Sequence, residues 1–144
     1  MAKSNKQQFT LVPFVREKSH HITVVALLSG RPARLIVDTG AGGTIVDTGA
    51  LAQFGLKLSS TSRKGVGVGS SSMRTSRIAK YRLVLGDLDV SDTRLLALDL
   101  SHVNAGLTKA KVAPVHGVLG ADVLWRHRAL IDYSRGLLFL ERAS

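Results

Sequence analysis

The sequence predicts an all-β domain, and three features of composition and patterning support that fold class. The 144 residues suit one compact domain. Apolar residues make up 44% of the chain, which is enough to form a core. Gly is frequent, with 14 residues, and Pro is rare, with 3, a balance that favours many tight turns. The apolar residues recur in short alternating runs, which is the spacing of half-buried strands.

The first third of the chain predicts a tail, a strand and a hairpin. Residues 1–8 are polar and basic and are expected to form a flexible tail before a domain that spans residues 9–144. A first strand is expected over residues 9–15. Alternating apolar positions on both sides of a Ser-Gly turn predict a hairpin over residues 22–37. The end of this hairpin, residues 35–37, is apolar at every position and is expected to be buried on both faces.

The middle of the chain predicts a short helix and a long hairpin. Asp47 precedes an Ala- and Leu-rich run that ends at Gly55, and these residues are start and stop signals of a helix. Residues 57–68 and 76–85 are expected to be strands. They lie on either side of a tip rich in Gly and Ser, residues 65–72.

The last third predicts short strands and one short helix. The strands are apolar runs bounded by turn residues, over 88–98, 115–119, 129–131 and 137–140. A short helix is expected over 121–126, and the polar segment 99–111 is expected to be irregular, with one helical turn. An apolar strand that ends in a Gly-containing loop before a short helix occurs twice, at 35–54 and 115–126. This repetition suggests two related halves within one domain.

The composition excludes several kinds of chemistry. There is no Cys, so disulfides, thiolate nucleophiles and Cys-based metal sites are impossible. The five His form no HExxH arrangement, so neither a metal nor another cofactor is expected. The apolar runs fall far short of the roughly 20 residues that span a membrane. The polar start lacks the apolar segment of a signal peptide, so a cytoplasmic location is expected.

The chain is basic, with a formal net charge of +10. Between Thr48 and Gly86 there is no acidic residue. The basic residues of this stretch are Lys57, Arg63, Lys64, Arg74, Arg77, Lys80 and Arg82. Such a stretch is usually the solvated surface of a hairpin, although it also suits an acidic partner. From Lys57 to Arg82, Tyr81 is the only aromatic residue, so nucleic acid, which needs stacking platforms, is not expected as a partner.

The residue that best suits catalysis is Asp38, at the end of the apolar hairpin arm. Small residues follow it, beginning with Thr39, Gly40 and Ala41, and they let backbone N–H groups and a substrate approach closely. The Thr39 hydroxyl can hold the loop by a hydrogen bond. Asp-Thr-Gly occurs again at Asp47, where the carboxylate is expected to cap the short helix. The tripeptide alone is therefore weak evidence, because a turn-forming Asp has the same neighbours.

A longer comparison gives the Asp38 segment a clearer meaning. Residues 35–56, LIVDTGAGGTIVDTGALAQFGL, resemble the active-site segment of the retropepsin-like aspartic peptidases, the single-lobe, retroviral-type family. Residues 115–124 resemble the apolar-apolar-Gly motif of that family and the helix after it, and residues 131–140 resemble its closing strands. The resemblance covers about residues 20–140. It implies a closed, β-barrel-like acid-protease lobe with a flap hairpin and one or two short helices.

The resemblance also implies which residues form the site. They are Asp38 as the catalytic carboxylate, Thr39, Gly40 and Ala41 as its supporting loop, Gly67, Val68 and Gly69 as a flap that binds substrate, and Val118, Leu119 and Gly120 as the second motif of the cleft. The flap would close over an extended peptide and offer it backbone groups. The implied activity is hydrolysis of peptide bonds in a peptide or protein substrate.

One carboxylate cannot serve as both general base and general acid for an attacking water. Two carboxylates about 3 Å apart can, because they cannot both ionise and therefore share one proton. The chain contains one convincing motif, so a symmetric homodimer is expected, with one Asp38 from each subunit. The ionised Asp38 would take a proton from water while the protonated one polarises the scissile carbonyl. Pairing of Asp38 with Asp47 is disfavoured, because Asp47 is expected to cap a helix behind the strand.

Two other functions stay open on the sequence alone. A lobe that fails to dimerise would be a non-catalytic peptide-binding module, and the basic stretch would also allow a nucleic-acid-associated β-domain. By resemblance, the strands at residues 9–15 and 137–140 are expected at the dimer interface. Trp125 is expected to fill the core or an interface. His116 either lines the cleft or lies on the surface.

Overall fold

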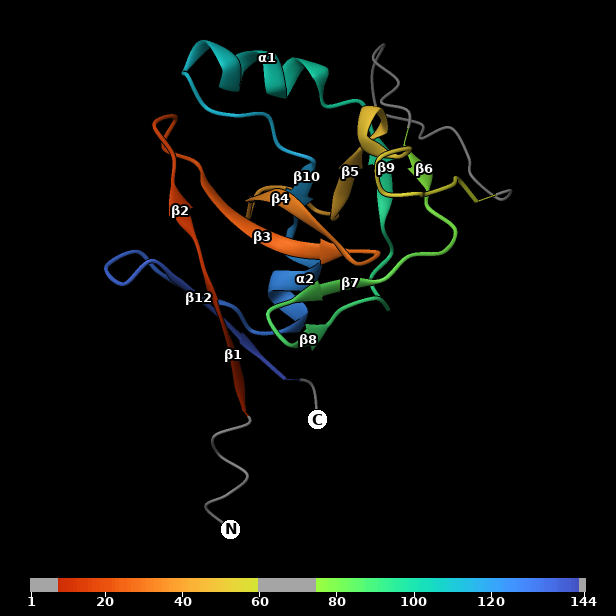
Figure 1. The fold of residues 1–144 in the computed structure, drawn as a ribbon. Coiled ribbons are helices and arrows are strands. Elements are labelled where there is room, and N and C mark those ends of the chain that lie inside the picture. Colours follow the sequence, from red (N-terminus) through yellow and green to blue (C-terminus); the bar gives the residue numbers. More distant parts are fainter. Residues whose placement is uncertain (1–7, 60–74, 143–144) are drawn as a thin grey trace.

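Twelve strands, two α-helices and one 3₁₀ turn form the part of the chain that a computed structural model describes, residues 8–59 and 75–142 (Figure 1). The strands are β1 (Phe9–Pro13), β2 (Val15–Arg16), β3 (Ile22–Leu28), β4 (Arg31–Val37), β5 (Ile45–Asp47), β6 (Ser76–Arg77), β7 (Leu83–Leu85), β8 (Leu88–Asp89), β9 (Leu96–Leu98), β10 (Gly117–Leu119), β11 (Leu130–Asp132) and β12 (Leu137–Glu141). The helical elements are η2 (Thr48–Ala50), α1 (Ser101–Lys109) and α2 (Ala121–Arg126). The predicted all-β class with short helices is confirmed, and the larger sheet curls into a half-barrel. None of these helices is long and apolar enough to cross a membrane.

The larger sheet places a strand from the second half of the chain between two strands from the first half. Its order is β6-β9-β5-β10-β4-β3-β7-β8, and β2 pairs with β3. β10 runs parallel to β4, with Val118 opposite Ile36. It runs antiparallel to β5, with Val118 opposite Ile45. The connection from β4 to β5, which carries Asp38, therefore has to pass around the end of β10.

The hairpin of β3 and β4 forms where the alternation predicts it. Ser29 and Gly30 both have positive φ, 48° and 82°, as expected for a two-residue turn whose twist matches that of the strands. Leu35 lies in the main core, whereas Ile36 packs in a second apolar cluster with Leu107 of α1. The arm that leads to the catalytic candidate is thus buried on both faces, as predicted.

A smaller sheet of order β1-β12-β11 closes the domain. Asp87, in the turn between β7 and β8, ties this sheet to the larger one by accepting hydrogen bonds from Thr10 and from Arg142. These two bonds hold the pKa of the Asp87 carboxyl below its usual range. Because β12 lies in the middle, both of its edges are paired. Within the described chain, the outer edges of this sheet belong to β1 and β11.

The segment 99–111 contains helix α1, so the expectation of an irregular segment is wrong. The Asn104 side chain donates to the carbonyl of Val115 at 3.1 Å and accepts from its N–H at 2.8 Å. Leu107 is buried against Ile36 and Val115. Most of the stability of a short helix comes from tertiary packing of this kind, which the polar composition of the segment does not reveal.

The strands predicted over 76–85 and 88–98 are each broken in two. The Ser91 hydroxyl accepts a hydrogen bond from the N–H of Leu83 at 2.9 Å, and the Asp89 carboxylate accepts from the N–H of Ser91 at 2.8 Å. Side chains here replace the partners that a continuous strand would supply. The break between β8 and β9 therefore lies at short polar residues that compete for backbone groups.

The helix predicted after Asp47 is reduced to the single 3₁₀ turn η2, followed by turns as far as Gly55. The Asp47 carboxylate does cap it, accepting from the N–H of Gly49 at 3.3 Å. The same oxygen accepts from the N–H of Leu100 at 3.0 Å. The prediction that Asp47 is a structural cap is consistent with these bonds.

Candidate active site

The loop that carries Asp38 is held from both sides by the end of β10. The N–H of Asp38 donates to the carbonyl of Leu119 at 3.0 Å. After the loop has turned, the N–H of Ala121 donates to the carbonyl of Ala41 at 2.7 Å. Figure 1 shows β4, β10 and β5 side by side, with α2 following β10. The crossing of the chain halves thus fixes both ends of the Asp38 loop.

The Asp38 carboxylate is exposed and has a defined orientation. Its Oδ1 accepts a hydrogen bond from the N–H of Gly40 at 2.8 Å, and the N–H of Ala41 donates to the Asp38 carbonyl at 3.2 Å. Thr39 is exposed beside it, and its hydroxyl makes no hydrogen bond within residues 8–59 and 75–142. The predicted loop residues therefore surround the carboxylate, and the Thr39 side chain is available to a partner.

The second predicted motif lies beneath this loop. Val118, Leu119 and Gly120 are all buried. A Cβ on Gly120 would lie 2.4 Å from the carbonyl oxygen of Gly43 and 2.9 Å from that of Ala41, both in the Asp38 loop. Only Gly allows so close an approach of two backbones. The motif supports the loop in this structure, and its contact with a substrate stays a prediction.

A buried polar network that the sequence does not predict clamps the far end of the loop to α2. The Thr44 hydroxyl donates to Asp122 Oδ1 at 2.7 Å, and the Thr44 N–H donates to Asp122 Oδ2 at 3.1 Å. The N–H of Gly120 donates to Thr44 Oγ1 at 3.1 Å. The only sequence signal for this network is an acid in the first turn of a predicted helix, which usually indicates a favourable position near the helix N-terminus.

Asp122→Ala is expected to lower the free energy of unfolding by about 1–3 kcal/mol, because it leaves the buried Thr44 hydroxyl and N–H without acceptors. Denaturant unfolding measures the loss. Asp122→Asn is the matched comparison. Its free energy of unfolding should lie between those of the wild type and Asp122→Ala, since its amide keeps one acceptor oxygen. Equal stability of Asp122→Ala and the wild type would contradict a structural role for this network.

His116 lies at the start of β10, the end away from Asp38. Its Nδ1 accepts a hydrogen bond from the backbone N–H of Arg34 at 2.9 Å, and its ring packs edge-on against Phe54. Burial lowers the pKa of His116 below its ordinary 6.5, and the charge of Arg34 lowers this pKa further, while Asp47 opposes both. The side chain is half-buried and braces β4 against β10.

This lowered pKa predicts a loss of stability in acid. Below about pH 6.5 the unfolded chain binds a proton at His116 before the folded chain does, so stability falls with pH until the folded-state pKa is passed. A proton on Nδ1 would also break the bond from Arg34. His116→Gln cannot titrate, so its melting temperature should fall less steeply between pH 6.5 and more acid conditions than that of the wild type. Melting temperatures of the two proteins that fall in parallel below pH 6.5 would refute the prediction. Well above pH 6.5 the two melting temperatures should run parallel, which is the control.

The two segments that would form the stem of the predicted flap pair with each other. Leu58 and Ile78 form an antiparallel bridge. The N–H of Ala79 donates to the carbonyl of Lys57 at 2.9 Å, on the same ladder. The predicted flap residues Gly67, Val68 and Gly69 lie outside the residues that the structure describes, so the flap stays a prediction.

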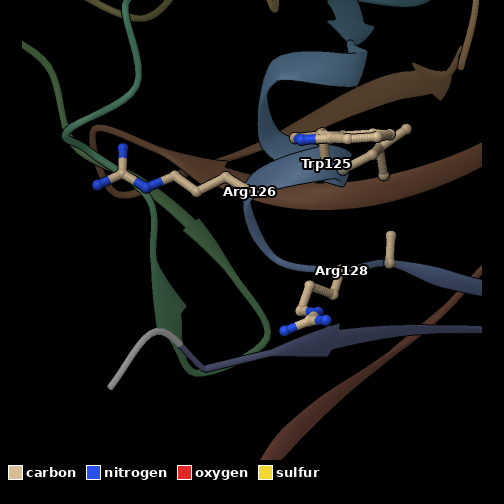
Figure 2. Close-up of a pocket in the computed structure, with 5 residues that line it drawn as sticks. Trp125, Arg126 and Arg128 are labelled. Carbon is tan, nitrogen blue, oxygen red and sulfur yellow. The ribbon is translucent and has the colours of Figure 1, made fainter.

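A hollow lies beside the Asp38 loop, between α2 and β11. It has a volume of about 330 Å³. It is lined by Thr39, Ala121, Leu124, Trp125, Ala129 and Ile131. A second hollow, of about 660 Å³, adjoins it and shares Leu124, Trp125 and Ala129 with its lining (Figure 2). The Trp125 side chain is 87% exposed, so the expectation that it fills the core is wrong, while a place in an interface stays open.

Trp125 is exposed because the short helix α2 uses its other side for the core. Val123 and Leu124 are buried there, and the indole extends from the opposite face.

In residues 8–59 and 75–142, no three His, Asp or Glu side chains lie close enough together to hold a metal ion. The chemistry that the described site offers is that of the Asp38 carboxylate.

Comparison with known proteins agrees with this fold. A family model described as aspartyl protease matches residues 24–123. The chain therefore belongs to the aspartyl protease family. None of the curated protein sequences matches this chain.

Solved structures support the same fold. A retropepsin-like aspartic protease from Rickettsia conorii is similar with a TM-score of 0.56 at 17% identity, over 92% of this chain and 89% of that chain. The retroviral protease-like domain of Ddi1 from Leishmania major is similar with a TM-score of 0.56 at 18% identity, over 84% of this chain and 88% of that chain. The predicted retropepsin-like fold is confirmed.

Proposed function

We propose that this chain is a homodimeric aspartic endopeptidase in which one Asp38 from each subunit forms the catalytic pair. The observation that carries the proposal is the exposed, oriented carboxylate of Asp38 in a loop clamped at both ends. Membership of the aspartyl protease family supports peptidase activity. The substrate would be a peptide held in extended form between this loop and the predicted flap.

The second carboxylate has to come from another chain, and the position of Asp47 supports this requirement. The N–H of Asp47 donates to the carbonyl of His116 at 2.8 Å, at the start of β10. The N–H of Asp38 donates to Leu119, at the end of the same strand. The two acids therefore lie at opposite ends of β10 and cannot share a proton within one chain.

The reaction follows from two Asp38 carboxylates that share one proton. The ionised carboxylate takes a proton from a water molecule, whose oxygen attacks the scissile carbonyl carbon. The protonated carboxylate donates to the carbonyl oxygen as the tetrahedral intermediate forms. As the intermediate collapses, the C–N bond breaks, the amine leaves with the proton that the first carboxylate took from water, and one hydroxyl of the intermediate returns its proton to the second carboxylate. The Gly40 N–H fixes one oxygen of each carboxylate, so the geometry is set before substrate binds.

The proposal is tested by measuring size and peptidase activity over the same range of protein concentration. Sedimentation should detect a dimer, and cleavage per mole of chain should rise as the dimer forms, because a monomer carries half a site. A stable monomer that binds peptides without cutting them would support the peptide-binding module instead. Salt-sensitive binding to DNA or RNA without cleavage would support the nucleic-acid reading.

A further inference from the structure

We infer that Trp125 anchors the dimer by packing into the hollow between α2 and β11 of a second copy of the chain. The inference rests on the proposed function, because it takes the two Asp38 carboxylates to meet at a two-fold axis. It adds the surface that brings them together and the side chain that contributes most to it. The partner on this surface is another copy of the same chain.

The position of the axis follows from the chemistry of the pair. If two Asp38 carboxylates share a proton, the axis passes beside Asp38, and the adjacent Thr39 lies next to it. In a two-fold dimer the same patch of each subunit contacts its own copy. A hollow that is lined by Thr39 therefore lies at or near the interface. The hollow of about 330 Å³ is such a feature, since Thr39 and Trp125 both line it.

The hollow and the indole suit each other in size and character. Pockets that hold small ligands begin at about 300 Å³, so the hollow has room for one aromatic side chain. Besides Thr39 and Trp125, its lining consists of apolar residues: Ala121, Leu124, Ala129 and Ile131. Trp125, at 87% exposed, is the most exposed of the large apolar side chains in the described chain. An exposed Trp beside an apolar hollow is the pattern of an interface hot spot.

The strand next to the hollow extends the same surface. β11 is an outer strand of the smaller sheet, and within the described chain no strand pairs with its outer edge. Leu130, on this strand, is 59% exposed. An uncovered strand edge with apolar side chains is suited to pairing with another chain. The sequence-based expectation placed residues 9–15 and 137–140 at the interface. β12 has both edges paired, whereas β1 and β11 are the outer strands, and β11 is the one next to the hollow.

The charges around Trp125 argue against nucleic acid as the occupant. Figure 2 shows the Arg126 side chain extending away from the indole, with Arg128 on another side of the larger hollow. Arg126 pairs with Asp92 at 2.5 Å, and Arg128 pairs with Glu141 at 3.8 Å. Both guanidinium groups are thus already balanced by carboxylates, whereas phosphate binding needs uncompensated positive charge.

The test uses the fact that Trp125 is the single Trp of the chain. As protein concentration rises through the range in which sedimentation detects the dimer, Trp emission should shift to shorter wavelength and acrylamide quenching should weaken. Trp125→Ala should raise the dissociation constant of the dimer at least about tenfold. Its peptidase activity should return at high concentration, since Asp38 is intact. Leu27→Ala, which truncates an exposed side chain on β3, is the matched control and should change neither property.

The outcomes separate this inference from the proposed function. A dimer that cleaves peptides while its Trp emission and quenching stay those of an exposed indole would overturn the inference and leave the proposed function standing. Absence of both dimer and cleavage at all concentrations would overturn the proposed function and the inference with it. The fluorescence measurement uses the wild-type chain, so the test does not depend on a variant that folds.

Discussion

Asp38→Asn is expected to abolish peptide-bond hydrolysis, with a loss on the order of 10³-fold or more, and to leave the chain folded. The amide cannot take a proton from water or share one with a second carboxylate. Its oxygen can still accept from the N–H of Gly40, which is 2.8 Å from Asp38 Oδ1, so the loop should keep its shape. Cleavage of a peptide substrate measures the loss, and thermal unfolding verifies that the melting temperature is preserved.

Mixing the two proteins distinguishes a shared site from independent sites. With equal amounts of wild type and Asp38→Asn in random dimers, about one quarter of the dimers carry two Asp38 residues. Activity per mole of total chain should therefore fall to about one quarter of that of the wild type. A fall to about one half would mean that each chain acts alone, and the shared-site proposal would be wrong. Asp47→Asn is the control from the second Asp-Thr-Gly and should keep its activity.

Among the glycines of the Asp38 loop and Gly120 beneath it, Gly120→Ala is expected to have the largest effect on stability. The new Cβ would lie 2.4 Å from the carbonyl oxygen of Gly43, a distance that the two backbones can relieve only by moving apart. Such overpacking costs at least about 1–3 kcal/mol. The movement would also strain the 2.7 Å bond between Ala121 and Ala41, so activity should fall further than stability. Denaturant unfolding and peptide cleavage measure the two effects.

Gly42→Ala provides the control within the same loop. A Cβ at Gly42 meets no atom within 4 Å, so this variant should keep its stability. If Gly120→Ala behaved like Gly42→Ala, the end of β10 would not be packed against the Asp38 loop as described.

Elements whose cause is local in the chain could be predicted from the sequence. The β3–β4 hairpin follows from alternating side chains and a turn at Ser29 and Gly30, all within one short segment. The cap at Asp47 follows from a carboxylate that lies two residues before Gly49, whose N–H donates a hydrogen bond to it. The position of Asp38 after a strand buried on both faces follows from three consecutive apolar residues. In each case the residues that cause the feature are neighbours in sequence.

Features that depend on distant residues could not be predicted in this way. Thr44 and Asp122 are 78 positions apart, and nothing near either residue indicates that they form a hydrogen bond. Helix α1 depends on Asn104 and Leu107 meeting β4 and the segment before β10. The exposure of Trp125 depends on which side of α2 contacts the core. Tertiary contacts decide these three features. Whether a single residue is polar or apolar does not reveal which distant residues it contacts.

The place of β10 between β4 and β5 has a consequence for the order of folding. β4 and β5 are close in sequence but do not pair with each other. The strand that lies between them, β10, begins some 70 or more residues further along the chain. Closing so long a loop costs entropy that only the completed core recovers. A nascent chain that ends before β10 therefore has Asp38 but no support beneath its loop. The proposed peptidase activity would therefore require that the second half of the domain has been made and has joined the first.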